Sequence, residues 1–99
     1  MPTRSEILYF LSEKKSTFQN SYHITKLGLF GSYAREMADE NSDIDILIEL
    51  QPNTPDIYEL KKEIKKIVKS KFNKEVDVCR ERSIKPVFRD MIFREVVYV

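Results

Sequence analysis

The sequence is poor in the residues that form cross-links and flexible backbone. Its one cysteine, Cys79, cannot form an internal disulfide, which suits a reducing compartment such as the cytoplasm. Its only two glycines, Gly28 and Gly31, both fall between Leu27 and Leu50. No apolar run is long enough to span a bilayer, and the N-terminus lacks the apolar segment of a signal peptide. We therefore expect a cytoplasmic protein with no membrane contact.

The chain also lacks a strong charge of either sign. Its 17 basic residues nearly cancel its 16 acidic residues, which argues against a strongly electrostatic nucleic-acid binder. A run of lysines follows Glu59, but Glu63 stands among them, so we interpret the run as the solvated face of a helix. The lysines of this run are Lys61, Lys62, Lys65, Lys66, Lys69, Lys71 and Lys74.

The length and composition predict one small domain over residues 1–99. A chain of 99 residues that is 41% hydrophobic can supply one core with little to spare. Surface shared with a partner is therefore relevant to stability.

The pattern of the chain predicts alternating helices and strands. Thr3 and Glu6 form a capping-box pattern that opens a helix over 3–19. Thr54 and Pro55 suit the N-cap and first position of a second long helix, which ends near Phe72. The other expected elements are a strand ending at Gly31, a short helix from Ser32, strands over 43–50 and 74–79, a helix over 86–94 and a short edge strand after it. This order predicts a mixed α/β domain, with helices packed on a small mixed β-sheet.

Asp43 and Asp45 alternate with isoleucines in the strand over 43–50. Because successive side chains of a strand point to opposite faces, the two aspartates share one face and Ile44, Ile46 and Ile48 share the other. Two neighbouring carboxylates repel one another, so one takes up a proton, the pair lies in water, or a divalent cation binds both. The simpler interpretation is a solvated strand entry with ordinary aspartates, which would leave the Gly31–Ser32 spacing a coincidence. A calcium loop would have polar spacers and a glycine soon after, so the isoleucines favour a rigid strand that displays carboxylates to a metal.

The Gly31–Ser32 pair, ten residues before Asp43, predicts a phosphate site. Gly31 allows a tight turn and the close approach of a ligand. Ser32 begins the short helix, whose free N–H groups and positive dipole end suit phosphate oxygens. The alternative is that Ser32 is a plain N-cap.

Asp77 is the candidate third carboxylate. It lies between two valines in a predicted strand, and a third carboxylate would complete a two-metal site. Asp77 is also placed to take a proton from an attacking hydroxyl, as a weak base that relies on the metal. The simpler interpretation is one polar residue on an exposed strand face. His23 suits a surface or structural role, and Cys79 a small buried hydrophobic residue and not a nucleophile.

Gly31–Ser32, ten residues, Asp43-x-Asp45 and a later strand aspartate, Asp77, together resemble the minimal nucleotidyltransferase family of the polymerase-beta-like superfamily. "LGLFGSYAR", "SDIDILIE" and "KPVFRDMIFREVVYV" resemble its characteristic segments, and the resemblance covers nearly the whole chain. One departure is Glu36–Met37, where relatives often have a glycine after the Ala-Arg pair. The resemblance therefore does not fix the path of the following loop.

The resemblance implies an enzyme that transfers AMP from ATP and releases pyrophosphate. Asp43 and Asp45 would hold two Mg²⁺ ions, and Asp77 would hold the catalytic one. Gly31 and Ser32 would bind the β- and γ-phosphates, while Arg35 would either steady phosphates or pair with an acidic neighbour. Family members act as antitoxins that adenylylate a tyrosine of a HEPN ribonuclease toxin, so we expect a hetero-oligomer with such a partner.

Two other functions are consistent with these residues. The chain could neutralise its partner by covering the active site of the toxin, with the nucleotide fold kept as a scaffold. It could also be a subunit of a small-molecule nucleotidyltransferase, although the short chain leaves the acceptor wall to another subunit.

Overall fold

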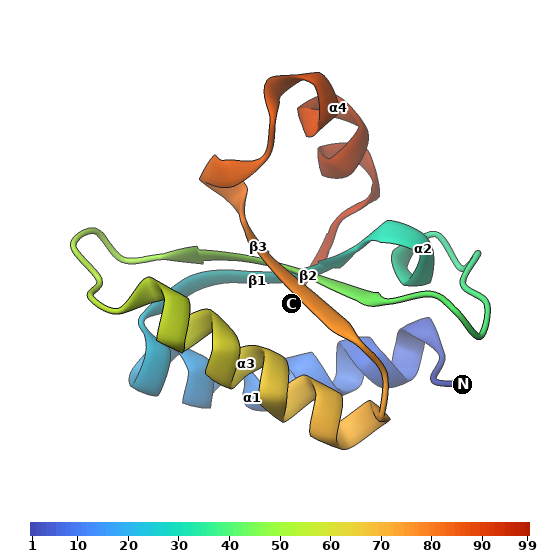
Figure 1. The fold of residues 1–99 in the computed structure, drawn as a ribbon, viewed down its shortest axis with the longest axis horizontal. Helices are drawn as coiled ribbons and strands as arrows, with labels where there is room; N and C mark the ends of the chain where they lie inside the picture. The colour runs from blue at the N-terminus through green and yellow to red at the C-terminus, as the bar shows by residue number, and fades with distance from the viewer.

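A computed structural model describes all 99 residues, and Figure 1 shows the arrangement of its elements. The elements in chain order are α1 (Arg4–Tyr22), β1 (Ile24–Phe30), α2 (Gly31–Ala34), β2 (Ile44–Leu50), α3 (Ile57–Phe72), β3 (Val76–Arg80), the 3₁₀ helix η1 (Glu81–Ser83), α4 (Pro86–Glu95) and β4 (Val97–Tyr98). None of the helices is both long enough and apolar enough to cross a membrane.

The four strands form one mixed sheet in the order β3-β2-β1-β4. The central strands β1 and β2 are antiparallel, β4 is antiparallel to β1, and β3 is parallel to β2. Helices α1 and α3 cover one face of the sheet, and α4 stands over the other face (Figure 1). The predicted mixed α/β fold is confirmed.

The hydrophobic core lies between the sheet and helices α1 and α3. Ile44, Ile46 and Ile48 of β2 are fully buried there, as the alternation in this strand predicts. From α3, the core receives Leu60, Ile64 and Val68, and α1 contributes Ile7, Leu11 and Phe18. Since the isoleucines take this face, the aspartate of β2 is left on the face beneath α4.

The start of α1 was predicted correctly, and the start of α3 was not. Thr3 accepts a hydrogen bond from the Glu6 backbone N–H at 3.1 Å, and the Glu6 side chain accepts one from the Thr3 N–H at 3.0 Å, which completes the capping box. The Thr54 hydroxyl instead donates to the Gln51 carbonyl and closes a turn. The N-cap of α3 is Asp56, in a left-handed conformation with φ 54°.

Candidate functional site

The structure brings two of the three predicted aspartates side by side at one end of the sheet. Asp45 of β2 is paired in register with Asp77 of β3 on one side and with Phe30 of β1 on the other. Asp43 is exposed and stands just before the first residue of β2. The candidate site is therefore centred on Asp45 and Asp77, with Asp43 at its margin.

Asp45 experiences the predicted conflict between carboxylates. Burial of its side chain, followed by the negative charges of Asp77, Asp43 and Glu95, raises its pKa from 3.8 to about 6. The positive charge of Arg35 opposes this shift only in part. The site thus carries an excess of negative charge that no group of the protein balances.

Gly31 is in direct contact with Asp45. Its φ is +76°, in the left-handed region that favours glycine, and a Cβ atom at this position would overlap Oδ2 of Asp45. The predicted phosphate-binding residue and the predicted metal ligand are therefore neighbours, although 14 positions separate them in the chain (45 − 31). A close approach of a ligand was predicted at Gly31, and in the structure the group that lies this close is the Asp45 carboxylate.

The short helix begins one residue earlier than predicted. Phe30 is the N-cap of α2 and Gly31 is its first residue, so Ser32 lies inside the helix and is not its N-cap. The left-handed φ of Gly31 allows the chain to turn into the helix at once, before Ser32 is reached. Ser32 remains partly exposed, one residue beyond the glycine that touches Asp45.

Arg35 pairs with Glu95, an acidic residue that the sequence analysis did not single out. Nη1 of Arg35 lies 2.5 Å from Oε2 of Glu95, whose side chain is only 10% exposed. This contact is the acidic pairing that we predicted as one of two roles for Arg35. Glu95 ends α4, sixty residues from Arg35, so no local spacing in the sequence links it to the site.

Cys79 contacts Asp77 from the same strand face. Its thiol donates to Oδ2 of Asp77 at 3.6 Å, and burial together with the Asp77 charge raises the pKa of the thiol to about 11. The thiol is therefore protonated at neutral pH, which agrees with the prediction that Cys79 is not a nucleophile. Cys79 is only half-buried, so the prediction of a buried hydrophobic residue was only partly correct. Its i, i+2 spacing from Asp77 was the signal in the sequence that the two side chains share one face of the strand.

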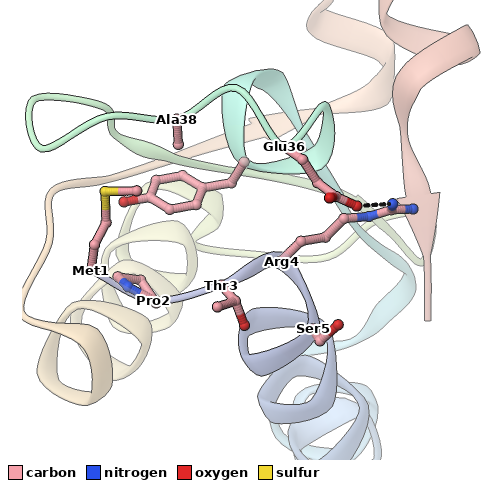
Figure 2. Close-up of a pocket in the computed structure, with 8 residues that line it drawn as sticks. Met1, Pro2, Thr3, Arg4, Ser5, Glu36 and Ala38 are labelled. Atoms are coloured by element: carbon pink, nitrogen blue, oxygen red, sulfur yellow. Dashed lines mark hydrogen bonds and ion pairs between the residues drawn. The ribbon is translucent and has the colours of Figure 1, made fainter.

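Glu36, which stands where relatives often have a glycine, lies at the start of the loop after α2. Glu36 adopts φ +59°, a conformation in which a glycine is favoured, and its carboxylate pairs with Arg4 at 2.9 Å. A pocket of about 280 Å³ adjoins this pair, between residues 1–5 and the side chains of Tyr33, Glu36 and Ala38 (Figure 2). None of the aspartates of the site lines it, so this pocket is distinct from the candidate site.

The carboxylates fit a hard divalent cation bound together with a substrate. No group of three His, Cys, Asp or Glu side chains lies close enough together to enclose a metal ion by itself. Mg²⁺, however, usually binds to proteins through one or two carboxylates plus substrate phosphates, and Asp45 and Asp77 supply such a pair on adjacent strands. The roles of Asp43, Asp45 and Asp77 as metal ligands remain a prediction.

Comparison with known proteins identifies relatives over the whole chain. The family described as "Nucleotidyltransferase domain" matches residues 5–99. The protein adenylyltransferase MntA of Thermococcus cleftensis is 33% identical over 99 residues, which cover 100% of this chain and 98% of that protein.

Solved structures share the fold at lower identity. A chain of a toxin–antitoxin complex solved with AMP-PNP has a TM-score of 0.66 and 23% identity, covering 98% of this chain and 72% of its own. A chain from the complex of tri-AMPylated Shewanella oneidensis HEPN toxin with MNT antitoxin has a TM-score of 0.57 and 21% identity, covering 96% of this chain and 67% of its own. At these identities the likeness extends to the fold alone.

Proposed function

Because the chain belongs to the nucleotidyltransferase domain family, we propose that it is a Mg²⁺-dependent adenylyltransferase that transfers AMP from ATP to a tyrosine of a HEPN-type toxin. Transfer to this tyrosine would block the ribonuclease, so the chain would act as an antitoxin. The observation that carries the proposal is the register of Asp45 and Asp77 beside Gly31. The name of the Thermococcus relative, a protein adenylyltransferase, supports the choice of a protein as acceptor.

Gly31 and Ser32 are the proposed binding residues for the β- and γ-phosphates of ATP. The free N–H groups at the start of α2 suit phosphate oxygens, and the left-handed φ of Gly31 sets this turn directly beside Asp45. Arg35 lies one turn further along, where Glu95 fixes the direction of its guanidinium group. We propose that Arg35 adds positive charge near the phosphates from this position.

Asp43, Asp45 and Asp77 are the proposed ligands of two Mg²⁺ ions. When bound, these ions would lower the pKa of the acceptor hydroxyl and neutralise charge on the phosphates. The aspartates orient the nucleotide relative to the acceptor, and their own negative charges are balanced at the same time. The raised pKa of Asp45 supports this proposal, since burial and then the neighbouring carboxylates disfavour its negative charge in the absence of a cation.

The transfer itself exchanges one phosphorus–oxygen bond for another. The acceptor oxygen bonds to the α-phosphorus of ATP, the bond from that phosphorus to the bridging oxygen breaks, and pyrophosphate leaves beside Gly31. The hydroxyl proton passes to the Asp77 carboxylate and then to solvent, because Asp77 is exposed at the edge of the sheet. The Cys79 thiol orients Asp77 by its hydrogen bond.

The acceptor would come from a partner that docks on α4. This helix has no buried residue, and Val87, Phe88 and Met91 are 78%, 48% and 54% exposed. It stands over the same sheet face as the candidate site (Figure 1). An apolar helix face beside an open site suits a protein partner, so we propose a hetero-oligomer in the cytoplasm, where ATP is available and Cys79 stays reduced.

The test is the transfer of label from [α-³²P]ATP to a purified HEPN-type partner in the presence of Mg²⁺. We expect label on the partner with the wild-type chain, and none after chelation of the metal or with Asp43→Asn/Asp45→Asn. Label that fails to reach the partner, or that reaches it equally well with the double variant, would reject the proposal. A panel of aminoglycosides in place of the partner tests the small-molecule alternative.

A further inference from the structure

A basic pocket lies beside Asp77, at the open edge of the sheet. It has a volume of about 200 Å³ and is formed by Tyr58, Lys61, Lys62 and Lys65 of α3 together with Asp77 and Val78 of β3. β3 is one of the two edge strands of the sheet, and α3 runs past it (Figure 1). One of the proposed catalytic carboxylates is thus part of a pocket whose other charged groups are lysines.

None of the three lysines of the pocket has a carboxylate partner, whereas Lys69 of the same run does. Lys69 pairs with Glu75 at 2.7 Å, and the ammonium group of Lys74 donates to the Glu40 carbonyl. Neither Lys61 nor Lys65 forms an ion pair, although Lys65 lies close enough to Glu75 to contribute to its lowered pKa. Lys65 is exposed and Lys61 partly exposed, as the predicted solvated face requires, so both ammonium groups are accessible to a ligand in this pocket.

Lys61 lines this pocket together with Asp77. It lies close enough to Cys79 to oppose the rise in the pKa of this thiol, and Cys79 in turn contacts Asp77. Tyr58 completes the pocket with a ring that is 75% exposed, and the ammonium group of Lys62 lies 6.0 Å from the centre of that ring. Tyrosine is among the residues enriched at protein interfaces, because its ring offers apolar contact and its hydroxyl a hydrogen bond.

The order of the groups across the sheet places this pocket on the acceptor side. Gly31 contacts Asp45 from one side, Asp77 stands in register with Asp45 on the other, and the pocket lies beyond Asp77. Phosphoryl transfer requires the attacking and leaving oxygens to lie roughly in line. If pyrophosphate leaves at Gly31, as the proposed function states, then the acceptor hydroxyl approaches over Asp77, next to the lysines.

We propose that this pocket is a specificity site for the acceptor, in which Lys61 and Lys65 bind acidic side chains that flank the modified hydroxyl. This inference rests on the proposed function, because the position of the leaving group defines which side is the acceptor side. The occupant is an acidic segment of the partner polypeptide, since the donor polyphosphate belongs at the opposite end of the site. Tyr58 contributes apolar contact to the same segment.

The test measures peptide binding to the full ¹⁵N-labelled chain by amide chemical-shift titration. Three synthetic peptides of equal length carry one central tyrosine flanked by glutamates, glutamines or lysines. The variant is Lys61→Glu/Lys65→Glu. The matched control, Lys66→Glu/Lys71→Glu, makes the same charge change on the same helix but outside the pocket. Inorganic pyrophosphate serves as a separate probe for the polyphosphate of a nucleotide.

We expect the glutamate peptide to bind most tightly and to shift the amides of residues 58–65 and 76–78. The Lys61→Glu/Lys65→Glu variant should bind it about tenfold more weakly, as two exposed ion pairs are lost, while the control binds like wild type. Equal binding of the glutamate and glutamine peptides, or unchanged binding by the pocket variant, would overturn the proposal. So would pyrophosphate that shifts the same amides more strongly than the glutamate peptide.

A parallel assay separates this inference from the proposed function. Transfer of AMP from ATP to the same three peptides is measured with each variant. If the glutamate peptide binds most tightly but receives no AMP, the result would count against the proposed transfer reaction and support the pocket as a binding site for acidic segments. Transfer that is equally efficient on all three peptides would support the chemistry and overturn the pocket.

Discussion

Asp45 destabilises the metal-free protein at neutral pH. Its carboxyl group has a pKa of about 6 in the folded chain against an ordinary 3.8, so the folded state holds the proton more tightly than the unfolded state does. Stability therefore falls as the pH rises from about 4 to 6, and the loss is complete above this window. A bound cation would remove the penalty, which is why we associate it with function.

Replacing Asp45 by asparagine should stabilise the metal-free chain at pH 7.5. The pKa shift corresponds to about 3 kcal/mol, but the carboxyl group is partly exposed and screened, so we expect a gain of about 1 kcal/mol. Below the unfolded pKa both forms are neutral, and the gain should disappear. Urea unfolding of both proteins at pH 7.5 and pH 3.5 measures this difference. A gain that is equal at both pH values would contradict the charge argument.

Glu36 occupies a position that favours glycine. Its φ of +59° is left-handed, and its pairing with Arg4 is exposed and therefore weak. Glu36→Gly and Glu36→Ala both remove the pairing, but only glycine adopts this φ without strain. We expect the glycine variant to be more stable than the alanine variant by about 1 kcal/mol, the reverse of their order in a helix. Thermal unfolding of the two variants decides it, and an alanine variant of equal or greater stability would contradict the assigned backbone.

At the scale of elements, Gly28 allows the C-terminal segment to lie against β1. A Cβ atom at Gly28 would lie 3.0 Å from Val96 Cγ2 and from the Val97 carbonyl oxygen, and 3.1 Å from Tyr98. Since β4 pairs with β1 at this point, a side chain here must push the strand away. Displacement of β4 would also move Glu95, the partner of Arg35.

Gly28→Ala should therefore lower the free energy of unfolding by about 1–3 kcal/mol. It should also speed hydrogen exchange of the Val99 amide, which donates to the Leu27 carbonyl at 2.9 Å. Thr25→Ala, an exposed position of the same strand, is the control and should change neither quantity strongly. Unchanged exchange at Val99 in the Gly28 variant would show that β4 does not depend on this glycine.

The elements differed in how well the sequence predicted them, for local reasons. The start of α1 and the alternation of β2 depend on neighbouring residues, and both were predicted correctly. The N-cap of α3 was not, because the Thr54 hydroxyl is used by a turn before the helix begins. Asp45 and Asp77 lie in register on adjacent strands, in agreement with the prediction that these two aspartates belong to one site. The Arg35–Glu95 pair joins elements that are too distant in sequence for the pairing to be predicted.

At the scale of the whole molecule, an apolar helix face and an open catalytic site lie on one side of the sheet. The chain buries no residue of α4, so the exposed Phe88 and Met91 are available to a partner. The opposite side is closed by α1 and α3, which pack on the core. The surface that we propose for the partner is therefore the α4 face of the sheet together with its β3 edge, where the basic pocket lies.

Phe88→Glu should weaken binding of the HEPN-type partner by at least about 30-fold, as expected for an anchor residue at the centre of an interface. Tyr9→Glu is the matched control, because Tyr9 is 67% exposed but lies on α1, on the other side of the sheet. Isothermal titration calorimetry with the purified partner compares the two variants, and ATP binding should be the same in both. If Tyr9→Glu weakens the complex and Phe88→Glu does not, the surface proposed for the partner has been assigned to the wrong side.

The central claim is that this protein neutralises its partner by chemistry at Asp43 and Asp45, and not by covering it. The most direct measurement is the growth of cells that express the HEPN-type partner together with either the wild-type chain or Asp43→Asn/Asp45→Asn, with recovery of the complex measured in parallel. Our account predicts that the double variant still forms the complex but fails to protect the cells. Full protection by the double variant would contradict the account and establish occlusion as the mechanism.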